Sequence, residues 1–171
     1  MKIFLLTIIC FSITALTVSA QNQSVYTSTK TTACKTIRST SKDAGSYEGE
    51  CPGVGSYKIR LIEGDLRQTI DIITPAKKKF ELDFWRFYGA FSSIGEKVEW
   101  RTKAGAPVAL IARYEVADPE GVKKGTSYLI VSKISKTLSC VTDVVPPGAR
   151  QNEEARRLAD AAVSKPCKSK E

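Results

Sequence analysis

Histidine is absent from all 171 residues, and methionine occurs only at position 1. The missing imidazole excludes Ser-His-Asp and Cys-His catalytic groups, histidine metal sites and a histidine-based pH switch. The sequence also has no Cys-x-x-Cys pair, no Gly-x-Ser-x-Gly elbow, no P-loop and no EF-hand spacing, so the usual redox, esterase, nucleotide and calcium motifs are missing. We therefore expect a non-catalytic protein that needs no cofactor, with a carboxylate-based hydrolase as the minor alternative.

Acidic residues are the scarcer charged class, with 18 against 26 lysines and arginines, which gives a formal net charge of +8. Long apolar runs are also scarce, and the one at the N-terminus follows Lys2 and spans residues 3–16, ahead of Val18-Ser19-Ala20. This pattern predicts a secretory signal peptide over residues 1–20, because the run is shorter than the ~20 apolar residues that cross a bilayer. We expect an exported, basic protein, periplasmic or extracellular, without a transmembrane segment after cleavage.

Four cysteines follow this leader: Cys34, Cys51, Cys140 and Cys167. An even number in an exported chain predicts two disulfides. The turn-rich segment 39–46 lies midway between Cys34 and Cys51, and a hairpin there brings those two together. Cys140 ends a strand-like run and Cys167 follows the last helix, so we predict Cys34–Cys51 and Cys140–Cys167, both structural.

The mature chain reads as one mainly β (α+β) domain over residues 34–171, after a polar arm at 21–33 that is either loose or a short edge strand. Gly64-Asp65 predicts a two-residue hairpin turn that sets Lys58 opposite Asp71. Apolar residues then alternate in three further segments, and turn signals separate them. The alternating positions are Val98, Trp100 and Thr102; Val108, Leu110, Ala112, Tyr114 and Val116; and Tyr128, Ile130, Ser132 and Ile134. This spacing predicts an antiparallel β meander that forms an open barrel or a sandwich.

Two helices are also expected. Asp83 is a candidate cap for a short aromatic helix that ends near Gly95 and carries Phe84, Phe87, Tyr88 and Phe91 at helical spacing. A clearer amphipathic helix spans roughly residues 152–164. Its inward stripe is Ala155, Leu158, Ala159 and Ala162, and its expected i,i+4 ion pairs are Glu153–Arg157 and Arg156–Asp160.

Four segments, 51–57, 63–68, 90–101 and 152–156, together resemble a group of small exported bacterial proteins of unassigned function. The likeness covers about residues 45–167. It implies a bacterial periplasmic home, and it implies no catalytic residue.

Basic groups are the feature that stands out among candidate site residues. Lysines interleaved with aromatics bind polyanions, and the same residues otherwise keep an edge strand soluble. The candidate anion-binding residues are Lys58, Arg60, Arg67, Lys77, Lys78 and Lys79. Glu63 and Asp65 at the hairpin tip are the candidates for carboxylate catalysis, and solvated tip charges are the commoner reading.

These observations predict an exported binding or structural protein of the cell envelope that engages anionic polymer or lipid head groups, with no specific nucleic-acid motif. The alternative is a small periplasmic inhibitor of an envelope hydrolase such as lysozyme. Charge weighs against the alternative, because loss of Lys2 leaves 25 basic and 18 acidic residues, a net +7, and many lysozymes are themselves basic.

Overall fold

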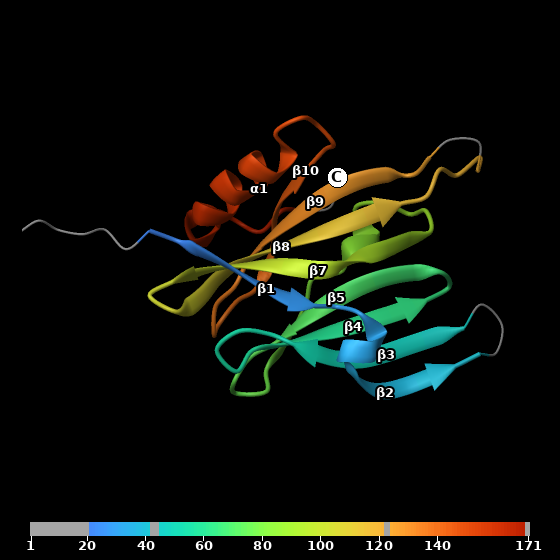
Figure 1. The fold of residues 1–171 in the computed structure, drawn as a ribbon, viewed down its shortest axis with the longest axis horizontal. Coiled ribbons are helices and arrows are strands. Elements are labelled where there is room, and N and C mark those ends of the chain that lie inside the picture. The colour runs from blue at the N-terminus through green and yellow to red at the C-terminus, as the bar shows by residue number, and fades with distance from the viewer. Residues whose placement is uncertain (1–20, 42–44, 122–123, 170–171) are drawn as a thin grey trace, which may run out of the picture.

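The computed structural model describes residues 21–41, 45–121 and 124–169 (Figure 1). The predicted leader, with Cys10, lies outside the described residues. Ten strands and one α-helix account for most of the described chain. The strands are β1 (Gln23–Ser28), β2 (Lys35–Thr40), β3 (Ser46–Pro52), β4 (Lys58–Gly64), β5 (Arg67–Ile73), β6 (Lys79–Glu81), β7 (Ser92–Lys103), β8 (Ala106–Val116), β9 (Thr126–Lys133) and β10 (Cys140–Val145). The helix is α1 (Gln151–Asp160), and the single 3-10 turns are η1 (Thr31–Ala33), η2 (Phe84–Arg86) and η3 (Ala162–Ser164).

All ten strands belong to one mostly antiparallel sheet, with the order β10-β9-β8-β7-β5-β4-β3-β2. In the described chain its two end strands, β10 and β2, do not pair with each other, so the sheet stays open. The prediction of a mainly β protein with an antiparallel meander is confirmed. The strands hydrogen-bond into one open sheet of ten strands.

The sheet is joined in the middle by little backbone pairing. β5 and β7 run parallel and share the single pair Arg67–Ser92. Two strands pair outside the main strand order. β6 pairs with the end of β5, and β1 pairs with β7 from Gln23–Thr102 to Ser28–Lys97. The polar N-terminal arm therefore contains the short strand that was one of its two predicted forms.

The hairpin of β4 and β5 forms where the sequence predicts it, but the predicted register is wrong by two residues. Its turn is Asp65-Leu66, with φ values of 53° and 57°, so Gly64 pairs with Arg67 and Arg60, not Lys58, faces Asp71. Two consecutive residues with positive φ match the twist of a tight hairpin. An even shift keeps every side chain on its predicted face, because the side-chain period of a strand is two.

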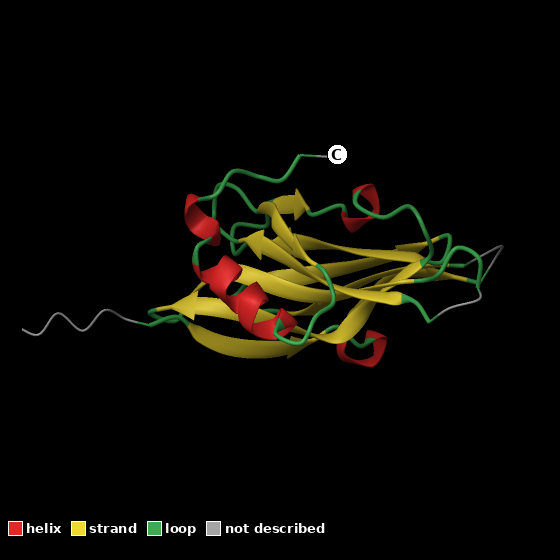
Figure 2. Ribbon diagram, turned by 90° about the horizontal axis from the view of Figure 1, so that it is seen from above, coloured by secondary structure: helices red, strands yellow, loops and turns green. Residues whose placement is uncertain are grey.

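One apolar cluster draws on both halves of the sheet and on the segment after β6. Its largest fully buried members include Trp100, Tyr114, Phe84, Ile59 and Ile70. A second, smaller cluster lies on the other face of β8 and β9, where Ile111, Leu129 and Val131 pack beneath α1 (Figure 2). The helix thus explains why the second face of these strands is apolar.

The C-terminal helix is confirmed, and Ala155, Ala159 and Ala162 of its predicted stripe are fully buried. Its predicted ion pairs are wrong. Arg157 pairs with Glu154, while Arg156 and Asp160 reach instead to β7. The sheet beneath the helix offers Arg156 and Asp160 buried partners of opposite charge. Each of these two side chains is held more strongly by its partner on the sheet than it would be by the other.

The predicted aromatic helix is the single 3-10 turn η2, and Gly95 lies inside β7 rather than at a helix end. Asp83 has a left-handed backbone with φ of 45° and makes no capping hydrogen bond. The aromatic rings instead find separate partners. Phe84 meets Tyr114 edge-on at 5.5 Å between ring centroids, and Tyr88 stacks on Tyr128 at 4.1 Å.

Both predicted disulfides are confirmed, Cys34–Cys51 across β2 and β3, and Cys140–Cys167 at the C-terminus. Two disulfides indicate an oxidising compartment. In the described ranges, no helix has the length and apolar character needed to span a membrane.

Candidate functional site

Half of the six predicted basic site residues are held by carboxylates. Arg60 lies 2.5 Å from Glu48 and 3.7 Å from Glu50, measured from guanidinium nitrogen to carboxylate oxygen. Arg67 pairs with Asp65, and Lys79 pairs with Asp71 and Glu81. These three residues are therefore largely neutralised by their neighbours on the sheet.

The other three predicted residues, Lys58, Lys77 and Lys78, lie at one end of the sheet. Four loops meet there: residues 53–57, 74–78, 104–105 and 134–139. In Figure 1 they lie together at the left end of the sheet. We name these loops, with the strand residue on each side of each loop, the lysine end.

The lysine end contains no aspartate or glutamate. Its lysines are Lys58, Lys77, Lys78, Lys79, Lys103, Lys133 and Lys136. Sequence reasoning missed Lys103, Lys133 and Lys136, which join the site only because strands distant in sequence end side by side. The sequence feature that could have identified them is their position at or near the end of a predicted strand in an antiparallel meander.

Contacts between the loops hold the lysine end together. Lys78 Nζ donates to the carbonyl of Thr137 at 3.2 Å and lies 4.5 Å from the centroid of the Phe80 ring. Ile134 N–H donates to the carbonyl of Val108 at 2.9 Å. These contacts place the loop 134–139 against both β6 and the start of β8.

Four of the lysines make neither an ion pair nor a side-chain hydrogen bond in the described chain: Lys58, Lys77, Lys103 and Lys136. Lys77, Lys103 and Lys136 are exposed. Lys133 donates instead to the carbonyl of Lys165 at 2.7 Å. These four ammonium groups are thus without a carboxylate partner, and such a set attracts anions over about a Debye length.

The opposite end of the sheet carries charges of both signs. The β4–β5 turn has Asp65 beside Arg67, and the loop between β8 and β9 has Asp118 and Glu120 together with Lys124. The lysine end differs from it in having no acidic residue.

The candidate catalytic carboxylates lie at the end of the sheet opposite the lysine end, and each has a partner. Glu63 accepts a hydrogen bond from Gln68 Nε2 at 2.5 Å, and Asp65 pairs with Arg67. Their arrangement is that of an ordinary hairpin tip, and nothing in it assigns catalysis.

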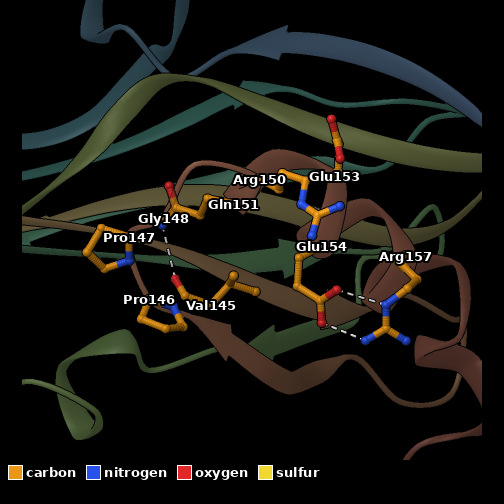
Figure 3. A pocket seen from close by; sticks show the side chains of 9 residues that line it. All are labelled: Val145, Pro146, Pro147, Gly148, Arg150, Gln151, Glu153, Glu154 and Arg157. Atoms are coloured by element: carbon orange, nitrogen blue, oxygen red, sulfur yellow. Dashed lines mark hydrogen bonds and ion pairs between the residues drawn. The ribbon is translucent and has the colours of Figure 1, made fainter.

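An open pocket of about 580 Å³ lies between the β10–α1 loop and α1 (Figure 3). Two of its charged groups pair with each other, since Arg157 donates to Glu154 at 2.5 and 2.8 Å. Gln151 Nε2 is likewise bound, to the carbonyl of Val145 at 3.1 Å. The other charged residues that line the pocket are Arg150 and Glu153.

Among the described residues, no group of three or more cysteine, aspartate and glutamate side chains is arranged to hold a metal ion. The absence of a cofactor remains a prediction.

Comparison with protein-family models, curated proteins and solved structures yields no match. The resemblance to small exported bacterial proteins thus remains a prediction, and functional reasoning rests on this chain's own residues.

Proposed function

We propose that the protein is an exported, non-catalytic envelope protein that binds anionic lipid head groups through its lysine end. The observation that carries the proposal is the gathering of unpaired lysines on four separate loops that contain no acidic residue. Each lysine close to an anionic membrane surface contributes about 1 kcal/mol. Four unpaired lysines thus suffice for reversible binding at low salt.

The shape of this end favours a surface over a chain-like polymer. The pocket by α1 and a second pocket beside Leu66 and Phe91 both lie away from the four loops. A polymer held by stacking needs a groove with exposed rings, whereas loop tips can rest on a membrane. Leu138, 45% exposed within the loop 134–139, adds an apolar group beside Lys136 that suits the boundary between head groups and acyl chains.

The hypothesis of an inhibitor of an envelope hydrolase stays a prediction. It requires a loop that enters a cleft, and the loops at the lysine end would be repelled by a basic hydrolase.

The test is co-sedimentation of the mature protein with vesicles of phosphatidylcholine, with and without phosphatidylglycerol. We expect binding only to the anionic vesicles, and a steep fall in binding between low and physiological salt, because screening there acts beyond about 8 Å. Protein that stays in the supernatant at low salt would contradict the proposal.

The decisive variants carry equal charge in different places. Lys77→Glu, Lys103→Glu and Lys136→Glu together should abolish co-sedimentation. The matched control, Lys97→Glu, Lys124→Glu and Arg150→Glu, has the same net charge but leaves the lysine end intact, and should keep most of the binding. Equal loss in both triple variants would show that net charge alone is responsible, and retention on heparin without vesicle binding would favour an anionic polymer.

A further inference from the structure

Arg86, the last residue of η2, is a half-buried arginine without a carboxylate partner. Within residues 21–41, 45–121 and 124–169, nothing forms an ion pair or a hydrogen bond with its guanidinium. Only Nε is both buried and unpaired, so the two terminal nitrogens, Nη1 and Nη2, keep accessible surface. A guanidinium has five N–H donors and is normally matched by carboxylate, phosphate or carbonyl oxygens. The place of Arg86 in the fold therefore calls for an explanation.

The residue lines a pocket of about 150 Å³ that three separate segments form. Arg86, Phe87 and Tyr88 come from η2 and the two residues after it, Val144 comes from β10, and Lys168 comes from the C-terminal segment. Two of these five residues are cations and none is acidic. A concave site with charges of one sign concentrates ions of the other sign, so this pocket favours an anion.

The guanidinium of Arg86 is held at the wall of the pocket. Its central carbon lies 5.0 Å from the centroid of the Phe87 ring, and that ring also lines the pocket. The backbone is fixed by the turn, since Arg86 N–H donates to the carbonyl of Asp83 at 3.3 Å and Phe87 N–H donates to that of Phe84 at 3.1 Å. The cation is thus positioned before any ligand arrives, which lowers the entropy cost of binding.

The second cation reaches the pocket through a different set of bonds. Cys167 is joined to Cys140 of β10 by the C-terminal disulfide, and Lys168 N–H donates to the carbonyl of Val141 at 2.8 Å. These two bonds fix the C-terminal segment against β10. The disulfide therefore places a second positive charge at the pocket.

The remaining walls are aromatic and apolar. Tyr88 is held in place by stacking on Tyr128, with 4.1 Å between the ring centroids, and Phe87 and Val144 complete the lining. A cavity of roughly 150 Å³ has room for one benzene-sized group. The pocket therefore suits a small ligand that combines an anionic group with an apolar body.

The shape of the anionic group follows from the donors. The planar fork of Nη1 and Nη2 matches the two oxygens of a carboxylate. Inorganic phosphate also matches the fork, but it would turn polar oxygens toward Phe87 and Val144, which offer them no hydrogen bonds. A carboxylate with an apolar body satisfies both parts of the pocket.

We infer that this pocket binds a small organic monocarboxylate. Nη1 and Nη2 of Arg86 donate to the carboxylate, Lys168 adds a second positive charge, and Phe87 and Val144 contact the apolar body of the ligand. The inference is independent of the proposed lipid binding, because none of the five lining residues belongs to the lysine end.

The test is amide chemical-shift mapping by NMR on the mature protein, at constant ionic strength, with sodium benzoate and sodium butyrate as probes. Benzamide and sodium phosphate serve as comparisons. We expect at least one carboxylate to move the amide signals of residues 86–88, 144 and 168 with a millimolar Kd. Benzamide has the size of benzoate without its charge and should bind about tenfold more weakly or less.

Four variants separate the contribution of Arg86 from that of net charge. Arg86→Gln should weaken carboxylate binding about tenfold, because it removes hydrogen bonds from a charged donor. Arg86→Lys keeps the charge without the fork and should weaken binding less. Arg150→Gln removes the same charge at an exposed position before α1 and should bind as wild type. Lys168→Gln should weaken binding less than Arg86→Gln, and it keeps the test valid if the Arg86 variants do not fold.

The inference fails if neither carboxylate moves these signals at tens of millimolar, or if benzamide binds as tightly as benzoate. Tighter binding of phosphate than of both carboxylates would also overturn it. So would undiminished binding by Arg86→Gln, or shifts confined to the lysine end, which would make the probes ligands of the proposed lipid-binding surface instead.

Discussion

Arg101 on β7 forms a two-bond ion pair with Asp160, the last residue of α1, with Nε 2.8 Å from Oδ1 and Nη2 3.0 Å from Oδ2. The guanidinium also donates to Ser24 Oγ and to the carbonyl of Asn22 on the N-terminal segment. One buried cation therefore joins the first strand, a central strand and the C-terminal helix.

Removal of this carboxylate should destabilise the fold. Asp160→Ala leaves Arg101, 8% exposed, without its main counter-charge, and we expect a loss of about 2 kcal/mol in the free energy of unfolding, since Asp160 itself is partly exposed. Urea denaturation measures the change. Glu154→Ala on the same helix breaks an exposed pair and should cost under ~0.5 kcal/mol. Equal losses in both variants would contradict a special role for Arg101–Asp160.

The hydrogen bond between the Trp100 indole and β1 should contribute to the stability of the fold. Its Nε1 donates to Thr27 Oγ1 at 2.8 Å, and the ring is fully buried. Thr27→Val leaves that donor without a partner and should cost about 1–3 kcal/mol. Thr36→Val, at an exposed position of β2, is the matched control. Stability unchanged by Thr27→Val would mean that water replaces the hydroxyl.

Stability should depend on the charge of Asp71. The pKa of this group is raised from 3.8 to about 6 in the folded state, chiefly by burial, so the folded state holds the proton more tightly. Its contribution is complete below about pH 4 and is lost as the pH rises through about 6, a difference of about 3 kcal/mol.

Asp71→Asn isolates this effect, because asparagine does not titrate. The stability of the variant relative to wild type should rise by about 3 kcal/mol between about pH 4 and pH 8 in urea denaturation. Other carboxylates act in the opposite direction at lower pH. Burial disfavours the charge of Glu99, but hydrogen bonds from Arg156, Ser24 and Tyr26 outweigh it and lower the pKa. A relative stability that is flat with pH would show that Asp71 is not perturbed.

The C-terminal disulfide should stabilise the fold by anchoring the segment around Cys167 to β10, rather than by packing in the core. Cys140–Cys167 closes a separation of 27 residues, and the chain-entropy estimate gives about 3 kcal/mol for a loop of this size. Joint replacement by serine should lower stability by about that amount. Non-reducing peptide mapping of wild type should find Cys34 linked to Cys51 and Cys140 linked to Cys167, and any peptide that crosses these pairs would contradict the structure.

Local sequence patterns predict those parts of the fold whose structure is determined by residues close together in sequence. Alternation around Trp100 and Leu110 predicts strands because their side chains must face one core. The stripe at Ala155 and Ala159 predicts α1 for the same reason. The pairing of Cys34 with Cys51 follows from the hairpin between β2 and β3. Each of these features depends on a few residues close in sequence.

Other features depend on geometry that no local pattern contains. Leu66 adopts a positive φ of 57° in the β4–β5 turn, although leucine is a poor turn residue, so the turn falls one position later than Gly64-Asp65 suggests. The aromatic spacing from Phe84 is that of a helix, yet Phe84 and Tyr88 pack against Tyr114 and Tyr128 of the sheet, and Phe91 is exposed. Lys77, Lys103 and Lys136 come together only through the sheet, and the predicted site therefore held just part of the cluster.

The pairing of β1 with β7 has a kinetic consequence. Gln23 finds its partner Thr102 far downstream, and β5 touches β7 through one residue pair, so little local structure brings the two halves together. Such long-range pairing slows folding toward milliseconds to seconds. During that interval the first strand is unpaired, with its backbone donors and acceptors exposed. We expect the chain to be most vulnerable to proteases and to aggregation at this stage, before β7 pairs with β1.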